Sequence, residues 1–308
     1  MKSVRSDWRL HDENCRTCRR KKNGNSELLM KHAMLTMREQ LDLEFTIIRL
    51  SDLDIEHCSG CESCMKTLIS GGDGCCVKKQ DDLSWLLEEL KDADGLIVAA
   101  PIYDLLPSGN LITLLNRALG VGKEYREMCR AQKKVCAAIA VGGSDWIDFT
   151  EPIMNLVLTN LSKDAIVIDR LVIGGYTAPA MVLLDDDLLS RAAQLGSNMV
   201  NALLNKQNAQ YQGPKGVCPG CHCNVIVPQN GLDVTCAFCK SRGKISIKND
   251  ALVIDWDKQS VETHRFTKQG EVDHQADIAS AHRRAFEGKD KIRERKEKYL
   301  AFEPVVKP

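Results

Sequence analysis

Two short apolar runs constrain the fold of this chain more than any other feature. Residues 95–100 and 135–141 contain no charged side chain. Strands that are apolar on both faces are typical of the middle of a parallel sheet, where helices cover each face. A loop containing proline or glycine follows each run, at 101–109 and 142–144. The runs therefore predict an α/β fold with parallel strands.

Helical and strand patterns alternate through the rest of residues 22–205. Apolar spacing predicts helices at 27–38, 81–90, 110–117, 152–161 and 185–204, and further strands at 43–50 and 165–173. This order fits a flavodoxin-like doubly wound parallel sheet, in which ligands bind beyond the carboxyl ends of the strands.

The first 21 residues do not fit such a sheet. They are polar and rich in arginine, whereas a doubly wound sheet normally opens with an apolar strand. We interpret residues 1–21 as an anomalous segment and hypothesise that they are an out-of-frame reading, with the native strand entering just before Lys21. The nucleotide sequence tests this idea, because a gene with no apolar strand in either other frame would exclude it.

Length and charge set limits on the class of protein. With 308 residues, of which 44% are hydrophobic, the chain can bury one large core and carry an appendage. Basic and acidic residues balance at 42 each, so nucleic acid is not an expected partner. No apolar run approaches the roughly 20 residues that span a bilayer, and no secretory signal is evident, so we expect a cytoplasmic protein without a membrane partner.

The 14 cysteines fall into tight groups rather than along the chain as in a disulfide framework. In a reducing compartment such grouping indicates metal or redox chemistry. Cys129 and Cys136 lie outside the groups, and we expect them to be small buried apolar residues. The groups are residues 15/18, 58/61/64/75/76 and 218/221/223/236/239.

A second unit begins after the polar linker at 205–214. Two Cys-x-x-Cys pairs flank a hairpin-like segment, 224–235, with Asn230-Gly231 at its turn. The four thiols of Cys218, Cys221, Cys236 and Cys239 have the spacing of a ribbon that holds one tetrahedral metal, with zinc favoured over iron. We expect this ribbon over 206–270, with strands at 252–256 and 261–266, and a charged helix at 273–299 within a tail of 271–308.

The loop at 22–26 suits a phosphate, because a Gly/Asn/Ser loop entering a helix supplies free backbone N–H groups. A simple helix cap by Asn25 or Ser26 is the alternative. Over residues 22–204 the chain resembles iron–sulfur flavoproteins of the NADPH-dependent FMN reductase group. That resemblance implies FMN binding by three loops, which contain Asn23, Gly24, Asn25 and Ser26; Pro101, Ile102, Tyr103 and Ser108; and Gly142, Gly143 and Ser144.

The resemblance also implies a [4Fe-4S] cluster on Cys58, Cys61 and Cys64, with Cys75 or Cys76 completing the set. We favour Cys76. The segment at 68–74 lengthens the gap before the fourth cysteine, although a glycine-rich loop can still close it. Free thiols, or a cysteine loop that only packs beside the flavin, are the alternatives. Asp81-Asp82, Tyr176 and residues 183–187 also resemble the corresponding segments of this group of flavoproteins.

Two functions remain open from the sequence. The first is an FMN-dependent oxidoreductase that passes electrons from NAD(P)H or a ferredoxin-like donor, through the cluster, to an unknown acceptor. The second is a cofactor-poor zinc-ribbon adaptor that binds a partner protein. Iron, zinc and FMN content would distinguish them. The resemblance further implies a homo-oligomer.

Overall fold

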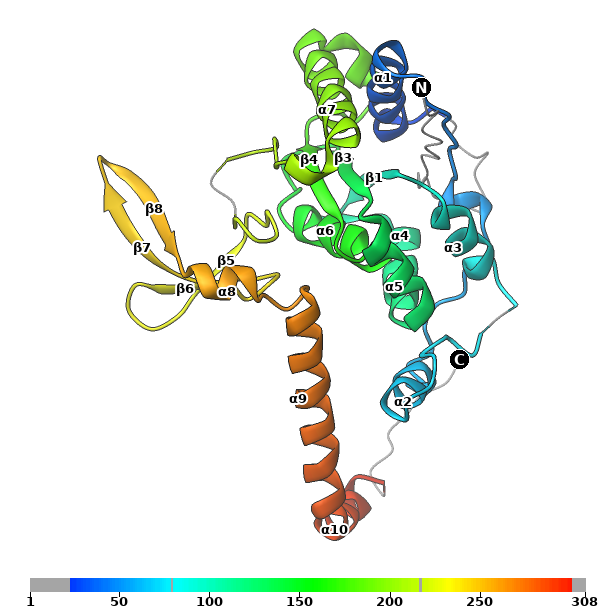
Figure 1. Cartoon of the computed structure of the whole chain (residues 1–308), viewed down its shortest axis with the longest axis vertical. Coiled ribbons are helices and arrows are strands. Elements are labelled where there is room, and N and C mark those ends of the chain that lie inside the picture. Colours follow the sequence, from blue (N-terminus) through cyan, green and yellow to red (C-terminus); the bar gives the residue numbers. More distant parts are fainter. Residues whose placement is uncertain (1–22, 79, 216–217, 301–308) are drawn as a thin grey trace.

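A computed structural model of the chain describes residues 23–300, apart from residue 79 and residues 216–217 (Figure 1). Its central sheet has the order β2-β1-β3-β4. β1 (Gly95–Tyr103), β3 (Val135–Gly142) and β4 (Ile166–Ile173) run parallel, and β2 (Leu106–Pro107) turns back antiparallel to β1. The apolar runs thus form the middle of a parallel sheet, as predicted.

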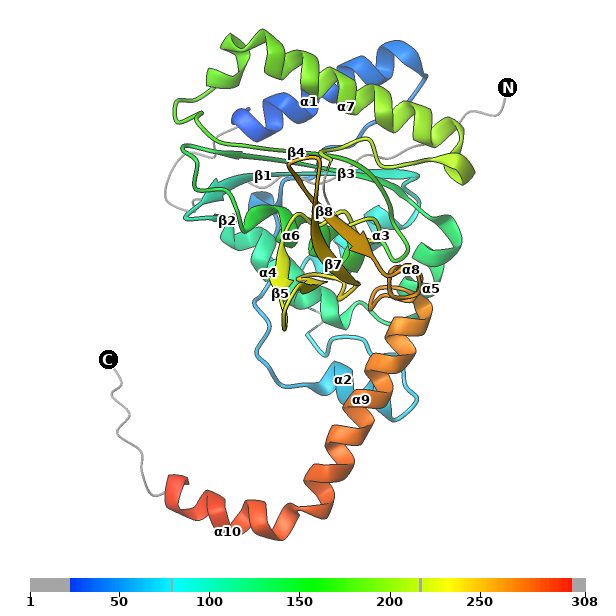
Figure 2. The same cartoon turned by 90° about the vertical axis from the view of Figure 1, so that its left-hand side faces the viewer.

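Helices cover both faces of this sheet (Figure 2). α1 (Asn25–Gln40) and α7 (Asp186–Leu204) pack on one face. α3 (Leu83–Lys91), α4 (Gly109–Arg117) and α6 (Thr150–Leu161) pack on the other. All residues of β3 are buried, which explains why its sequence is apolar on both faces. The predicted flavodoxin-like fold is confirmed, and we call these elements the sheet domain.

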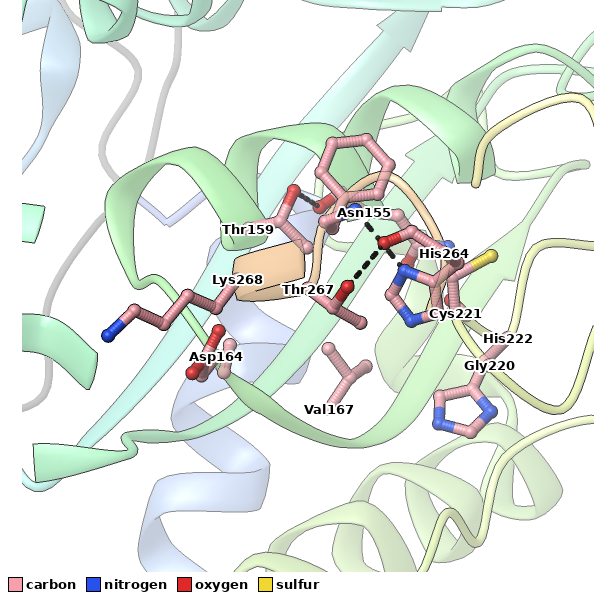
Figure 3. Close-up of a pocket in the computed structure, with 12 residues that line it drawn as sticks. Asn155, Thr159, Asp164, Val167, Gly220, Cys221, His222, His264, Thr267 and Lys268 are labelled. Carbon is pink, nitrogen blue, oxygen red and sulfur yellow. Dashed lines mark hydrogen bonds between the residues drawn. The ribbon is translucent and has the colours of Figure 1, made fainter. Parts of the chain in front are cut away.

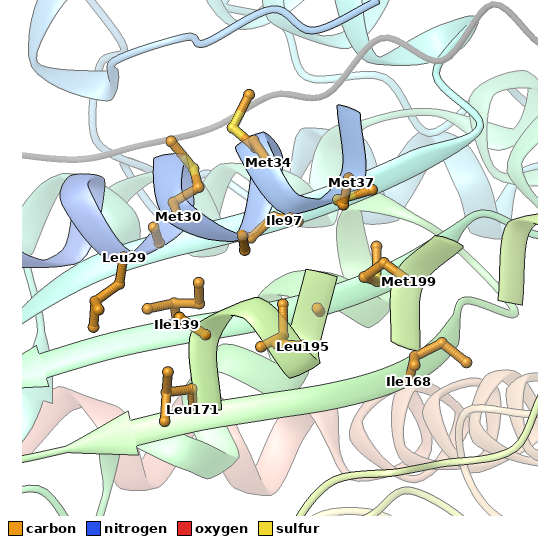
Figure 4. Close-up of a cluster of buried hydrophobic side chains, with 14 of the residues drawn as sticks. Leu29, Met30, Met34, Met37, Ile97, Ile139, Ile168, Leu171, Leu195 and Met199 are labelled. Carbon is orange, nitrogen blue, oxygen red and sulfur yellow. The ribbon is translucent and has the colours of Figure 1, made fainter. Parts of the chain in front are cut away.

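A dense layer of side chains joins α1 and α7 to the sheet (Figure 4). Met30, Met34 and Met37 of α1 belong to one buried cluster with side chains of the strands and of α7. At Gly196 a Cβ atom would lie 2.5 Å from the carbonyl oxygen of Ala33, so this glycine permits the close approach of the two helices.

Shorter elements complete the sheet domain. They are α2 (Ser63–Ile69), α5 (Lys123–Gln132) and the 3₁₀ turns η1 (Leu50–Asp52), η2 (Ala118–Gly120), η3 (Met181–Leu184) and η4 (Lys206–Asn208). Cys129 and Cys136 are buried as expected. Burial raises the pKa of Cys136 to about 12, so this thiol stays protonated.

The predicted strand at 43–50 is wrong for the part of the chain that the structure describes. Residues 43–48 belong to no named strand, although Leu43, Ile48 and Leu50 are buried. The alternation that suggested a strand reflects two buried faces, because Leu43 packs toward α1 and Ile48 toward α3. A strand also needs a neighbour for its ladder, and the anomalous segment 1–21 lies outside the described residues.

We call the C-terminal unit at 206–270 the ribbon. Its antiparallel sheet comprises β5 (Ile226–Pro228), β6 (Asp233–Cys236), β7 (Arg242–Lys248) and β8 (Ala251–Trp256). The predicted hairpin turn at Asn230-Gly231 is confirmed, with Gly231 at φ +64°.

The strand predicted at 261–266 is wrong. Trp256 pairs with Gly243 near the start of β7, so the chain leaves the sheet there. It then closes a helical turn in α8 (Lys258–Glu262), where the N–H of Val261 donates to the carbonyl oxygen of Asp257 at 3.0 Å.

The predicted helix at 273–299 is two helices, α9 (Lys268–Glu287) and α10 (Lys289–Leu300). Gly288 separates them, and glycine is a weak helix former. α9 leads away from the sheet domain (Figures 1 and 2). Among the described helices, none is long and apolar enough to span a bilayer.

Candidate functional site

Two of the predicted flavin-binding loops lie at the same edge of the sheet. β1 and β3 are paired with Ile102 opposite Gly142, so the loops that follow these strands emerge side by side. Ile102 is buried, Pro101 is half-buried and Tyr103 is exposed. Ser108 is buried at the start of α4.

The loop before α1 is tied to the end of β4. The amide Nδ2 of Asn25 donates to the carbonyl oxygens of Tyr176 and Ala178, at 3.0 Å each. Gly24 occupies the N-cap and no side chain caps the helix, so the predicted caps Asn25 and Ser26 do not form. A helix N-terminus without a side-chain cap is of the kind that binds an anionic ligand. The Oδ1 atom of Asn25 is also buried and has no hydrogen-bond partner among the described residues.

Charged side chains surround the start of α1. Glu27 is buried and forms ion pairs with Lys31 and Arg49, at 2.6 Å each. Its carboxylate also accepts from the backbone N–H of Asn23 at 3.1 Å. The N-terminus of an α-helix carries a partial positive charge of its own, which favours an anion such as phosphate. The sequence reasoning missed these ion pairs, although an acidic residue on the apolar face of a predicted helix could have indicated them.

A glycine that the sequence reasoning missed sets the shape of the loop after β3. At Gly174 a Cβ atom would lie 1.8 Å from the carbonyl oxygen of Ser144. The N–H of Tyr176 also donates to the carbonyl oxygen of Gly142 at 3.1 Å. The backbone of the loop thus packs directly on the chain that follows β4. Backbone packed this closely can present amides to a flat ligand.

Exposed aromatic side chains border the same edge. Tyr103 is 57% exposed, Trp146 is 61% exposed and Phe149 is 56% exposed. The hydroxyl of Thr150, the first residue of α6, donates to the carbonyl oxygen of Leu105 at 3.0 Å and joins the loops after β1 and β3. Large aromatic side chains left in solvent beside a binding edge suit a planar ligand.

An open cleft of about 680 Å³ lies beside these loops, at the chain that follows β4. Its lining includes Tyr176, Leu184 and Asp185. The hydroxyl of Tyr176 donates to Oδ2 of Asp185 at 2.5 Å, and this hydrogen bond raises the pKa of Tyr176. Asp185 also caps α7 by accepting from the N–H of Leu188 at 2.9 Å. The residues at 183–187 therefore shape the border of the site.

In the described part of the chain, the predicted cluster cysteines are not gathered closely enough to form a metal-binding group. Partial burial raises the pKa of Cys64, and the nearby thiols of Cys76 and Cys58 raise it further. Cys61 is exposed, and hydrogen bonds from Ser63 and Ser59 lower its pKa to about 7. A low pKa favours the thiolate, which is the form that binds iron.

Cys75 and Cys76 occupy different surroundings. Cys75 pairs with Val121, and a Cβ atom at Gly122 would lie 2.6 Å from its Sγ atom. Cys76 interacts with Cys64 and with the guanidinium of Arg117. These interactions favour Cys76 over Cys75 as the fourth ligand, which stays a prediction.

Arg117 on α4 holds both ends of the cysteine loop, and the sequence reasoning missed it. This residue is 2% exposed and forms an ion pair with Asp81. It donates to the carbonyl oxygen of Glu56 at 2.7 Å, before the loop, and to that of Lys78 at 3.2 Å, after it. Burial opposes ionisation of Asp81, but the hydrogen bond and charge of Arg117 lower the pKa of its carboxyl overall.

The ribbon gathers four buried thiols at a second site. The Sγ atoms of Cys218, Cys221, Cys236 and Cys239 all lie within 4.8 Å of one another. Cys218 and Cys239 are 3.6 Å apart, and Cys221 and Cys236 are 3.5 Å apart. A tetrahedral zinc ion with Zn–S bonds of about 2.3 Å spaces its thiolates by about 3.8 Å. The donor set therefore fits one tetrahedral metal ion.

A fifth buried cysteine, Cys223, lies beside this group. Its Sγ atom accepts from the N–H of Val225 at 3.4 Å. Its thiol also interacts with that of Cys236, although Cys223 is not a member of the group of four.

Comparison with known proteins gives consistent results. Residues 18–147 match the family described as NADPH-dependent FMN reductase. The chain is 24% identical over 251 residues to a flavone synthase of Aspergillus candidus, covering 75% of this chain and 77% of that protein. It is 32% identical over 123 residues to an iron–sulfur flavoprotein of Methanocaldococcus jannaschii, covering 39% of this chain and 56% of that protein.

A solved structure described as a flavone reductase has the same fold over nearly the whole chain. Its TM-score is 0.74 at 24% identity, and the alignment covers 98% of this chain and 99% of that one. The likeness therefore extends through the C-terminal unit as well as the sheet domain.

Proposed function

The chain belongs to the NADPH-dependent FMN reductase family, and from that premise we propose that this oxidoreductase uses FMN to pass reducing equivalents from NADPH to a flat aromatic acceptor. The overall reaction consumes NADPH, a proton and the acceptor, and it releases NADP⁺ and the reduced acceptor. FMN, when bound, supplies the hydride and electron transfer.

One observation carries this proposal. The N-terminus of α1 and the loops after β1, β3 and β4 converge at one edge of the sheet. We assign the phosphate to the loop of Asn23, Gly24, Asn25 and Ser26, because the partial positive charge of the helix N-terminus favours an anion. Ring contacts would come from Pro101, Ile102, Tyr103 and Ser108, and from Gly142, Gly143 and Ser144.

The acceptor class rests on the exposed aromatic side chains. Tyr103, Trp146 and Phe149 border the proposed flavin edge and leave their rings in solvent. A planar aromatic acceptor would stack among them and bury their surface. The flavone synthase relative is named for a compound of this flat aromatic class.

We further propose that Cys58, Cys61, Cys64 and Cys76 hold a [4Fe-4S] cluster. The shared electrostatic neighbourhood of Cys58, Cys64 and Cys76 supports it, and iron–sulfur flavoproteins are among the relatives. A cluster would supply one-electron transfer. Arg117 beside Cys76 would stabilise the added negative charge. A ferredoxin-like protein remains the alternative electron donor.

Zinc is the proposed ion for Cys218, Cys221, Cys236 and Cys239 in the ribbon. Four buried thiols at these spacings form a closed structural site. We also propose that the chain is organised in three structural units, at 22–205, 206–270 and 271–308, of which the second holds the metal. Their contacts include the hydrogen bond between Asn155 and Cys221, and the ion pair between Arg130 and Glu271.

We also propose a homo-oligomer. Large apolar side chains stand exposed on α9 and α10, namely Val272, Phe286, Ile292, Tyr299 and Leu300. A second copy that covers these helices would remove this surface from water. Light scattering on the full chain tests this, and a monomeric mass at micromolar concentration would contradict it.

Anaerobic turnover tests the proposed activity. The FMN-loaded protein should oxidise NADPH faster when a flavone is added, and the flavone should be consumed in equal amount. Trp146→Ala should raise the KM for the flavone and leave FMN binding unchanged. Lys258→Ala on α8, far from this edge, is the matched control. Equal oxidation with and without the flavone would contradict the acceptor class but not the flavin assignment.

A further inference from the structure

A cavity of about 280 Å³ lies between the ribbon and the sheet domain (Figure 3). α6 and the start of β4 form one side of it, and the turn at 220–222 with the segment at 264–268 forms the other. Val167 lines the cavity near the amino end of β4, whereas Gly174 follows the carboxyl end of that strand. The cavity and the proposed flavin site thus lie at opposite ends of the sheet. No function proposed above uses this space.

Asn155 places an unpaired hydrogen-bond acceptor at the cavity. This residue is 1% exposed, and its Nδ2 atom donates to the carbonyl oxygen of Cys221 at 3.2 Å. That bond fixes the orientation of the amide, because only its nitrogen can donate. The Oδ1 atom is buried and has no hydrogen-bond partner in the described part of the chain. Buried polar atoms nearly always have partners, so this atom indicates a donor supplied from elsewhere.

Neighbouring polar groups are already paired. The hydroxyl of Thr159 donates to the carbonyl oxygen of Asn155 at 3.0 Å, and that of Thr267 donates to the carbonyl oxygen of His264 at 2.7 Å. The Nδ1 atom of His264 accepts from the N–H of Phe266 at 3.2 Å. Burial lowers the pKa of His264, so its ring is neutral at pH 7. Among the buried side-chain oxygen and nitrogen atoms of the described residues that line the cavity, Asn155 Oδ1 is left without a partner.

The rest of the wall limits the chemistry of that ligand. Ala165, Val167 and the ring of Phe266 are apolar. An unpaired acceptor repels an anion, and so does the carboxylate of Asp164, which also lines the cavity. Lys268 is the cation of the lining, and its ammonium group points away from Asn155 (Figure 3). A strongly polar ligand would lose its hydration against these walls without new partners. Apolar cavities of about half this volume bind single aromatic rings.

We propose that this cavity binds a neutral, largely apolar aromatic molecule with one hydroxyl group, of the class of phenols and naphthols. The hydroxyl donates to Oδ1 of Asn155, and the ring lies against Val167 and Phe266. This site is separate from the flavin edge and does not depend on the proposed redox function.

A titration of the full-length protein with 2-naphthol, followed by naphthol fluorescence, tests the site. The control ligand is 2-methoxynaphthalene, which has the same ring but no hydrogen to donate. We expect 2-naphthol to bind about ten-fold more tightly, the usual effect of one buried hydrogen bond. Val167→Phe fills the cavity and should abolish this binding, while zinc content stays unchanged. Ala165→Leu is a second variant that fills less of the cavity. It should weaken binding and keeps the test open if Val167→Phe does not fold.

Variants at the flavin edge locate the binding. Trp146→Ala should leave naphthol affinity unchanged, because Trp146 lies at the other end of the sheet. Loss of binding in Trp146→Ala would place the ligand at the flavin edge and overturn the proposal. Equal affinity for both ligands would also overturn it, as would the absence of binding, which would mean that the cavity holds only water.

Discussion

Arg117 is the residue on which the cysteine loop depends most. Replacing it by methionine keeps the bulk but leaves the carboxylate of Asp81 buried without its partner. We expect a loss of about 3–5 kcal/mol in the free energy of unfolding, because breaking a buried ion pair strands a charge. Urea unfolding measures this loss. Iron content should fall as well, because both ends of the loop lose their anchor.

Arg126→Met on α5 is the matched control for Arg117→Met. Its guanidinium donates to the carbonyl oxygen of Leu119 in a more exposed setting, so its loss should cost under about 1 kcal/mol. Equal effects of the two substitutions would contradict the anchoring role of Arg117.

The ion pair between Arg117 and Asp81 makes the free energy of unfolding depend on pH. The pKa of Asp81 lies below its ordinary value of 3.8 in the folded protein, so the unfolded chain binds its proton more readily. The stabilisation is therefore present above pH 4 and is lost as the pH falls through the folded pKa. Urea unfolding between pH 7 and pH 3 should show this loss in the native protein. The loss should be smaller in Asp81→Asn, and identical profiles would rule out this role of the pair.

Substitution of Gly174 should change the affinity for FMN. In Gly174→Ala the new methyl group would lie 1.8 Å from the carbonyl oxygen of Ser144, so the loop after β3 must move. We expect FMN affinity to fall sharply, with a stability loss of about 1–3 kcal/mol from overpacking. Gly143→Ala meets the Thr177 side chain at 3.1 Å and should have a milder effect. Fluorescence titration with FMN measures both, and the reverse order would contradict the close packing.

Residues such as these show where the sequence was insufficient. The positions of Gly142–Ser144 were predictable, because they follow an apolar run. Gly174 was not, since its role comes from a loop 30 positions away that it meets only in the folded chain. Arg117 was detectable in principle, as a cation three residues after Leu114 on the apolar side of a predicted helix.

Among the helices and strands, those predicted from buried apolar runs were predicted correctly. β1 and β3 are buried on both faces, and their sequences are uniformly apolar. β7 was missed, because it is a largely exposed strand with charged residues such as Arg242 and Lys248. The segment at 43–50 shows the converse, since its sequence alternates but it forms no ladder with a described strand. Hydrogen-bonded neighbours are a tertiary property that local pattern does not encode.

The ribbon depends on its metal more than the sheet domain does. Its buried cluster consists of five cysteines and Phe238, packed against a few half-buried apolar residues. So small a core rarely folds without a metal or disulfides. Cys239→Ser should therefore abolish zinc binding and expose the ribbon to proteolysis, while the sheet domain keeps its FMN.

Limited trypsin digestion with metal analysis measures this effect. Cys223→Ser is the control, because Cys223 lies outside the group of four thiols. Loss of zinc in Cys223→Ser but not in Cys239→Ser would contradict the assigned ligands.

The whole molecule separates its sites along the central sheet. The proposed flavin site lies at the carboxyl ends of the strands, and the ribbon docks near their amino ends against α6. α9 is anchored at its first turn, where Glu271 pairs with Arg130 at 2.6 Å and with Lys163 at 3.2 Å. Beyond this turn the helix leads away from the sheet domain (Figure 1). Fold class and chain order were predictable from sequence, but these dockings rest on contacts between distant segments, such as the packing of Leu156 of α6 on the cysteine cluster.

Cofactor binding followed by anaerobic reduction tests the central claim most directly. The full chain, purified without oxygen and supplied with FMN, should retain about one flavin per chain, and NADPH should bleach the flavin absorbance near 450 nm. Gly174→Ala, which is expected to distort the ring-binding loop, should retain much less flavin. A chain that keeps zinc yet binds no FMN, or whose bound FMN is not reduced by NADPH or a ferredoxin, would contradict the account and favour an adaptor built on the ribbon.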